Sequence, residues 1–126
     1  MSEGYEKGMK MRRRVLGDAH VDAAEARKSD FDAAFQALIT EGAWGSVWAR
    51  ETISLRERSM LTIALLAAGG NFDEIPMHIR ATANTGASPD DVIAALLHVA
   101  VYAGVPKADR AIAIARDTYA EMGIET

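Results

Sequence analysis

The sequence contains no cysteine, and this absence removes a whole group of chemistries at once. Without a thiol the chain cannot form disulfides, use a cysteine nucleophile or a peroxidatic cysteine, or bind zinc through thiolates. Aromatic residues are also scarce, at 6% of a chain that is 49% hydrophobic, so the core must consist mainly of Ala, Leu, Ile and Val. We expect such small side chains to pack helices closely together.

Long apolar runs and a positive net charge are missing as well. The apolar run over residues 60–68 is much shorter than the roughly 20 residues that cross a bilayer, and residues 1–10 lack the apolar segment of a secretory signal. The net charge of −4 argues against nucleic-acid binding, which requires a basic face. We therefore predict a cytoplasmic protein with no membrane or nucleic-acid partner, and interpret the basic run at residues 10–14 as a solvated helix face or a subunit contact.

The N-terminal part of the chain carries signals for two helices. Residues 3–16 predict a charged amphipathic helix that Gly17 ends, followed by a polar connection over residues 17–22. Asp30 is the predicted cap of a short second helix. Four apolar residues at helical spacing should form its buried side: Phe31, Phe35, Leu38 and Ile39.

Residues 54–86 predict two helices joined at the glycine pair 69–70. Ser54 and Glu57 have the spacing of a capping box, and the following run is apolar on every face, as expected for a central helix enclosed by other elements. The pattern from Asn71 to Glu74 repeats the start signal and opens a helix that carries His78. A pocket between these two helices is the natural candidate for a site.

The C-terminal part predicts two further helices. One starts at Ser88 with a proline in its first turn and stops at Gly104. Its predicted buried side is Val92, Ile93, Leu96, Leu97, Ala100 and Val101. The last helix runs from about residue 106 to 122 and is closed by Gly123. With no alternating strand pattern, the chain is predicted to be a single all-α domain over residues 1–126, with about six helices, an N-terminal arm over about residues 3–28 and a helical core over about residues 30–123.

The histidines are the side chains that titrate near neutral pH in this chain: His20, His78 and His98. His78 shares a predicted helix face with Glu74, and a histidine beside a carboxylate is a usable proton donor. A buried histidine bonded to a backbone carbonyl is the structural alternative, and the spacing alone favours it. No pair of histidines has the spacing of a zinc-binding helix, so neither a metal nor a nucleotide cofactor is predicted.

Arginines and tryptophans near the same junctions suggest how a ligand could be held. Arg58 lies one turn into the central helix, and a guanidinium can grip a carboxylate with two parallel hydrogen bonds. Arg80 and Arg50 are either further carboxylate ligands or surface residues that cover apolar area. Trp44 and Trp48 lie one helical turn apart beside glycines, and form either a hydrophobic plug or the wall of a pocket for a small planar ligand.

Five short motifs occur in an order that resembles the 4-carboxymuconolactone decarboxylases of aromatic catabolism. The resemblance extends from about residue 5 to 122. The motifs are Arg13-Arg14-Val15-Leu16-Gly17-Asp18-Ala19-His20-Val21-Asp22, Ala43-Trp44-Gly45 with Trp48, Arg58-Ser59-Met60-Leu61-Thr62, His78-Ile79-Arg80-Ala81 and Tyr102-Ala103-Gly104-Val105-Pro106.

This resemblance implies an all-helical, alkylhydroperoxidase D-like fold and a homohexamer. Redox members of the superfamily carry a Cys-x-x-Cys where this chain has Asn71 and Glu74, so the resemblance is to its non-redox branch. The sequence departs from the decarboxylase pattern at Ala103, where a cysteine is common. It also departs at Pro76, which we expect to kink the helix that carries His78 or to open its first turns locally.

The implied activity is loss of CO2 from 4-carboxymuconolactone without a cofactor, in the protocatechuate branch of the β-ketoadipate pathway. The resemblance implies that Arg58 binds a carboxylate and that His78 acts on the dienolate oxygen or the proton. His20 and Arg14 would assist from the N-terminal segment, Arg80 would contribute to carboxylate binding, and three aromatic residues would form the wall: Trp44, Trp48 and Tyr102.

Two other functions fit the same residues. The first is a decarboxylase or isomerase of a related lactone or keto acid, because either reaction could use the same dienolate. The second is a non-catalytic helical oligomer that binds a small carboxylated compound. An assay of substrate absorbance together with released CO2 separates the three.

Overall fold

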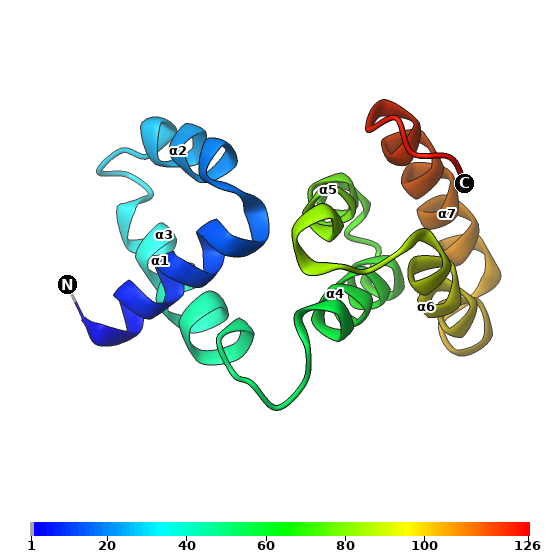
Figure 1. Cartoon of the computed structure of the whole chain (residues 1–126), viewed down its shortest axis with the longest axis horizontal. Helices are drawn as coiled ribbons and strands as arrows, with labels where there is room; N and C mark the ends of the chain where they lie inside the picture. The colour runs from blue at the N-terminus through cyan, green and yellow to red at the C-terminus, as the bar shows by residue number, and fades with distance from the viewer. Residues whose placement is uncertain (1) are drawn as a thin grey trace. The chain divides into compact units, whose positions relative to one another are not determined.

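A computed structural model describes residues 2–126 and divides them into two compact units, which meet at Ser54 and Leu55 (Figure 1). We call residues 2–54 the N-terminal unit and residues 55–126 the C-terminal unit. All regular secondary structure within 2–126 is helical, which confirms the predicted all-α class. Seven α-helices are present in this range, together with one π-helix and one 3₁₀-helix, compared with about six helices expected.

The N-terminal unit begins with α1 (Glu3–Leu16), as the sequence predicts. The Ser2 hydroxyl caps it by accepting a hydrogen bond from the Tyr5 backbone N–H at 3.0 Å. Acidic residues lie in the first turn and basic residues in the last, where each complements the helix dipole. Gly17 ends the helix with φ 91°, a conformation that glycine adopts without strain.

The same unit packs α1 against the π-helix η1 (Thr40–Trp48) through direct backbone contact. A Cβ atom at Gly8 would lie 1.9 Å from the Thr40 carbonyl oxygen, and one at Gly45 would lie 2.5 Å from the Gly4 carbonyl oxygen. Both distances are too short for any side chain. Two glycines are therefore what allows α1 and η1 to approach this closely.

The polar connection expected after Gly17 is instead a helix, α2 (Asp18–Arg27). Asp18 and Asp22 lie one turn apart on it, and both accept from the Arg13 guanidinium, at 3.1 and 2.9 Å. Polar composition therefore did not indicate a loop here. It reflects a helix face whose carboxylates pair with α1.

The short helix α3 (Ala33–Ile39) also differs from the prediction. It starts at Ala33 with Asp32, not Asp30, in the N-cap position, and Phe31 precedes it with 98% of its surface exposed. Phe35 and Leu38 are exposed as well, so the prediction that this stripe is core was wrong within this chain. Helical spacing identifies an apolar stripe but does not say what covers it.

Arg12 corrects the interpretation of the basic run. It is only 5% exposed, and its guanidinium lies 3.4 Å from both the Thr40 hydroxyl and the Gln36 side-chain oxygen. Glu25 of α2 lies 3.6 Å from the same group. This arginine is therefore an internal link of the N-terminal unit and not part of a solvated face.

In the C-terminal unit, α4 (Leu55–Gly69) ends at the predicted glycine pair, where Gly70 has φ 76°. Asn71 does not cap the next element with its side chain. A 3₁₀-helix, η2 (Phe72–Glu74), leads instead into α5 (Ile75–Thr85), so the second predicted capping pattern was wrong. Pro76 falls in the first turn of α5, where a residue without an N–H costs the helix no hydrogen bond. Pro76 is therefore at the start of the helix and not in its interior, where a proline would cause a kink.

The unit is completed by α6 (Pro89–Tyr102) and α7 (Val105–Glu121). Ser88 and Asp91 form a full capping box at the start of α6, which confirms the helix start predicted at Ser88. Helices α4, α5, α6 and α7 share one apolar core (Figure 1). Its fully or nearly fully buried members are Ile63, Ala67, Ile75, Ile79, Val92, Leu96, Val99, Ala108, Ala111, Ala115 and Tyr119.

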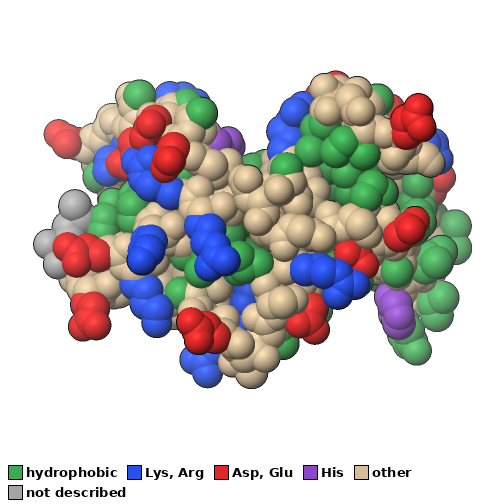
Figure 2. All heavy atoms as spheres, viewed as in Figure 1, with side chains coloured by type: hydrophobic (Ala, Val, Ile, Leu, Met, Phe, Trp, Pro, Cys, Tyr) green, Lys and Arg blue, Asp and Glu red, His purple; other side chains and the backbone are tan. Residues whose placement is uncertain are grey.

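Several large apolar side chains of this unit reach the surface, and Figure 2 shows hydrophobic side chains exposed beside α6 and α7. The exposed group on α4 and α6 comprises Leu61, Leu65, Ile93, Leu97 and Val101. The predictions that α4 is enclosed on all sides and that α6 buries its whole apolar set were therefore wrong for the single chain. Within residues 2–126, none of the helices combines the length and the apolar character required to cross a membrane.

Candidate functional site

The first predicted catalytic residue, Arg58, lies at the end of the first turn of α4 and is half-buried. Ser59, the next residue, has no exposed surface at all. The two side chains leave the helix about 100° apart because an α-helix has 3.6 residues per turn. Arg58 therefore lies at the margin of the core of the C-terminal unit, within reach of solvent.

The second predicted catalytic residue, His78, lies in the first turn of α5 and is 8% exposed. Thr82 and Thr85 follow it one and two turns later on the same helix face, and both are also buried. This polar stripe meets α4 at one point, where the Thr85 and Ser59 hydroxyls lie 2.7 Å apart. Helices α4 and α5 are thus joined by a buried hydrogen bond next to Arg58.

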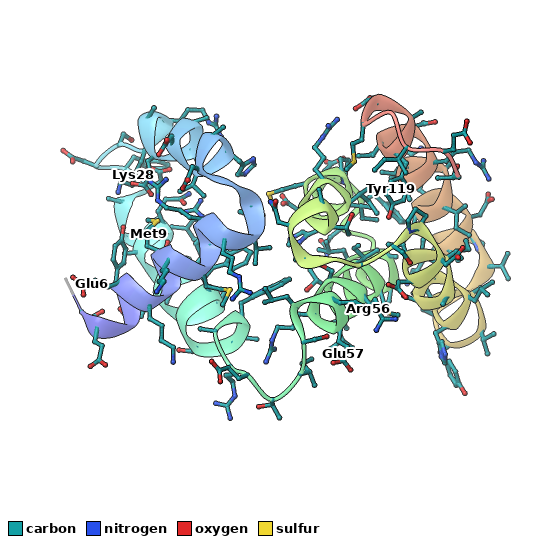
Figure 3. All side chains as sticks on the ribbon, viewed as in Figure 1. Glu6, Met9, Lys28, Arg56, Glu57 and Tyr119 are labelled. Carbon is teal, nitrogen blue, oxygen red and sulfur yellow. The ribbon has the colours of Figure 1, made fainter. Side chains whose placement is uncertain are left out.

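Tyr119 of α7, labelled in Figure 3, lies close to Thr82 of this stripe. Burial raises the pKa of its hydroxyl above the ordinary value, and the nearby Thr82 side chain opposes part of this rise. The phenol is therefore neutral at physiological pH. It contributes an uncharged polar group beside the buried Thr82 side chain.

Two other predicted residues of the C-terminal unit lie on its surface. Arg80 forms an ion pair with Glu121 of α7. Tyr102 is 84% exposed at the end of α6, and its ring stacks on His98 with a centroid distance of 6.1 Å. His98 and Tyr102 lie one turn apart on the same face of α6. Their part in binding a substrate stays a prediction.

The predicted aromatic wall of the N-terminal unit is a close pair of indoles. Trp44 and Trp48 are both buried in η1, with ring centroids 5.0 Å apart and planes tilted by 32°. Their position on one side of a helical turn confirms the local prediction. Whether they act as a plug or as a pocket wall stays open.

The two polar N-terminal candidates, Arg14 and His20, are exposed on α1 and α2. Their neighbour Arg13 forms hydrogen bonds with Asp22 and Asp18, and these bonds raise the pKa of its guanidinium. Arg14 is not part of that ion-paired group. Both residues retain the exposure that contact with a ligand requires.

A groove of about 490 Å³ opens between α6 and α7 at the C-terminal end of the chain. Apolar side chains of both helices line it, and Arg116 and Glu125 contribute charge. None of the residues predicted for the site is among its lining residues. Across residues 2–126, no cluster of three His, Asp or Glu side chains has the arrangement of a metal site.

Sequence reasoning missed the hydroxyl groups beside the predicted residues. Ser59 lies inside one of the motifs and Thr85 near the end of the His78 helix, but single hydroxyls are too common to attract attention. Their partnership spans 26 positions in the chain. Only the folded structure shows that both are buried and face one another.

Together, these features define an all-helical protein in which neighbouring helices present a buried histidine and a half-buried arginine. Such a pair can bind an anion and transfer a proton. The chain belongs to the carboxymuconolactone decarboxylase family, whose sequence model matches residues 33–117.

Individual relatives agree with this family. The chain is 38% identical over 120 residues to the 4-carboxymuconolactone decarboxylase of Acinetobacter baylyi. These 120 residues are 95% of this chain and 90% of the relative. It is 35% identical over 118 residues to the nitrosuccinic acid decarboxylase npaB of Metarhizium robertsii, covering 94% of this chain and 82% of the relative. A 4-carboxymuconolactone decarboxylase of Pseudomonas putida is 51% identical over 41 residues, which are 32% of this chain and 85% of the relative.

Proposed function

We propose that this protein catalyses the decarboxylation of 4-carboxymuconolactone to the β-ketoadipate enol-lactone and CO2, without a cofactor. The observation that carries the proposal is the 38% identity, over 95% of the chain, to a relative named for this reaction. The family match over residues 33–117 agrees with it. A cytoplasmic location is part of the same proposal.

The substrate can receive the electrons of its own bond cleavage. The C–C bond to the leaving carboxylate breaks, and its electron pair moves through the ring C=C bond into the lactone carbonyl, which gives a dienolate and CO2. A proton then adds to the carbon next to the carbonyl, which restores the lactone C=O and leaves the enol-lactone. The protein must hold the carboxylates, stabilise the dienolate oxygen and supply that proton.

Arg58 and His78 are the residues that we assign to these tasks. A half-buried guanidinium can bind a carboxylate with two hydrogen bonds, and a buried imidazole can donate to an oxygen or deliver a proton. We include His20, Arg14 and Arg80 as further polar contacts. The aromatic contacts are Trp44, Trp48 and Tyr102.

A second candidate substrate is nitrosuccinic acid, because a relative that is 35% identical over 94% of the chain is named for its decarboxylation. A nitro group accepts electrons from a departing carboxylate much as a conjugated lactone does. Both candidates also carry two carboxyl groups. The same arginine and histidine could therefore act on either molecule, and only an assay with both separates them.

We further propose that the protein assembles as a homohexamer. The exposed apolar side chains on α3, α4 and α6 support self-association, because isolated chains rarely leave so many large apolar groups in water. Light scattering coupled to size-exclusion chromatography measures the number of chains directly. A monomer at micromolar concentration would contradict this part of the proposal.

The first experiment is an assay of the purified protein. We expect the ultraviolet absorbance of 4-carboxymuconolactone to fall while an equal amount of CO2 is released, with no metal or coenzyme added. Parallel reactions contain nitrosuccinic acid. Turnover of that compound alone would favour the second candidate, whereas absorbance loss without CO2 would indicate an isomerase.

The second experiment tests the two assigned residues. We expect His78→Gln to lower kcat by about 10²-fold or more, the usual range for a lost general acid. We expect Arg58→Ala to raise KM and lower kcat/KM by a similar factor, and Arg58→Lys to recover only part of it. The matched control is Arg110→Ala, which removes an exposed arginine of α7. Near-normal turnover of folded His78→Gln and Arg58→Ala proteins would overturn the assignments.

A further inference from the structure

Ser59 and Thr85 form a hydrogen bond between two helices within the C-terminal unit. Their hydroxyl oxygens are 2.7 Å apart, Ser59 has no exposed surface and Thr85 is 9% exposed. Either hydroxyl can be the donor. This pair joins α4 to α5 where both helices are otherwise packed through apolar side chains.

Other buried threonines of this unit satisfy their hydroxyls without a link between helices. The Thr82 hydroxyl donates to the Ile79 carbonyl oxygen at 2.5 Å, and the Thr118 hydroxyl donates to the Ile114 carbonyl oxygen at 2.8 Å. Both satisfy the hydroxyl within their own helix. Replacing both members of a buried hydrogen-bonded pair by apolar groups of similar shape is also nearly neutral for stability.

The location of the pair relates it to the two residues assigned to catalysis. Ser59 directly follows Arg58 on α4. Thr85 lies on the same face of α5 as His78, seven residues and so about 10 Å further along the helix axis. A hydrogen bond between Ser59 and Thr85 therefore fixes how far α5 can slide or rotate against α4, and with it the placement of His78 relative to Arg58.

We propose that Ser59 and Thr85 are positioning residues, whose hydrogen bond holds α4 and α5 in the register that aligns His78 and Arg58 for the reaction. The inference rests on the proposed function for the roles of those two residues. Neither hydroxyl needs to touch the substrate. A displacement well below the length of one helical turn is enough to matter, because misplacement by about 1 Å can cost about 10²-fold in rate.

The test compares variants that change the hydroxyl with variants that change only shape. We expect Thr85→Val and Ser59→Ala each to lower kcat by about 10-fold to 100-fold with a smaller change in KM. The double variant should be no slower than the slower single variant, because both substitutions remove the same bond. Thr85→Ser keeps a hydroxyl and should recover most of the activity.

The matched control is Thr118→Val, which removes a buried hydroxyl that bonds only within its own helix. It should keep wild-type kcat, and the double variant should keep a wild-type denaturation midpoint. Equal losses in Thr118→Val and Thr85→Val would show a general packing effect and overturn the proposal. Wild-type kcat in Thr85→Val would also overturn it.

A second measurement separates this inference from the proposed function. The ring resonances of the three histidines can be recorded by NMR, with His78 assigned from the His78→Gln spectrum. We expect the His78 signal to shift in Thr85→Val and not in Thr118→Val, whether or not the protein turns over the proposed substrate. An inactive wild type with this shift would contradict the function but keep the positioning role. An unchanged His78 signal would contradict the positioning role.

Discussion

The two units of this chain are held together internally by opposite means. In the N-terminal unit, α1 and η1 touch backbone to backbone, because Gly8 and Gly45 leave no side chain between them. In the C-terminal unit, four helices are kept apart by a shared set of aliphatic side chains. The first arrangement is disrupted by adding atoms and the second by removing them.

The positions of the tryptophans allow the unfolding of the N-terminal unit to be followed separately. Both tryptophans of the chain lie in η1, so tryptophan fluorescence reports on the N-terminal unit. Circular dichroism reports on helices of both units. Each substitution below is therefore followed by both signals during denaturation.

The largest effect is expected from removing atoms in the C-terminal core. Leu96 is fully buried among the four helices, and Leu96→Ala should lower the free energy of unfolding by about 2–5 kcal/mol. The measurement is urea denaturation followed by circular dichroism. Lys107→Ala, at an exposed position of α7, is the control and should cost much less. Equal costs at the two positions would contradict the core described above.

Adding one methyl group to the N-terminal unit is expected to have the next largest effect. In Gly8→Ala the new Cβ meets a carbonyl oxygen of the facing backbone, which cannot rotate away, and we expect a cost of about 1–3 kcal/mol, typical of overpacking. The transition of tryptophan fluorescence should move to lower urea. The control is Gly42→Ala in η1, where no atom lies within 4 Å of the new methyl group. A cost at Gly42 as large as at Gly8 would show that backbone contact is not the cause.

The smallest effect is a dependence on pH in the C-terminal unit. The Arg56 guanidinium, and then the Ser88 backbone N–H, hold the pKa of Asp91 well below its usual range (Figure 3). A lowered pKa in the folded state stabilises the protein fully above the ordinary carboxyl pKa, near 4, and this contribution is lost as the pH falls further. The midpoint difference between wild type and Asp91→Asn should therefore be constant above about pH 5 and shrink below pH 4. A difference that grows in acid would contradict this sign.

Some local signals in the sequence predicted helix ends correctly. Ser88 with Asp91, and the glycines at positions 17, 70 and 123, mark helix ends through interactions with their immediate neighbours. All the residues that form such a cap or turn lie within a few positions of one another in the sequence. They could therefore be read without knowing the rest of the fold.

Several features that depend on distant parts of the chain were predicted wrongly. The apolar stripe of α3 and the exposed leucines of α4 have the spacing of core residues but are not covered within this chain. Arg12 is of a residue type that usually lies at the surface, but its guanidinium is buried against Thr40, Gln36 and Glu25. In each case the pattern gives the helix face, and the tertiary structure decides what that face meets.

The candidate site divides in the same way. His78 and Arg58 could be singled out because histidine and arginine have distinctive chemistry. Ser59 and Thr85 could not, because their significance comes from burial and from a bond across 26 positions. Their roles in the reaction stay predictions that the variants above test.

The short stretch between the two units has a practical consequence. Residues 50–54 belong to no helix, and the adjoining elements end at Trp48 and begin again at Leu55. A peptide ligation placed there would join two separately expressed segments without interrupting a helix. One segment could then carry isotopic labels while the other gives no signals, which would simplify the spectra.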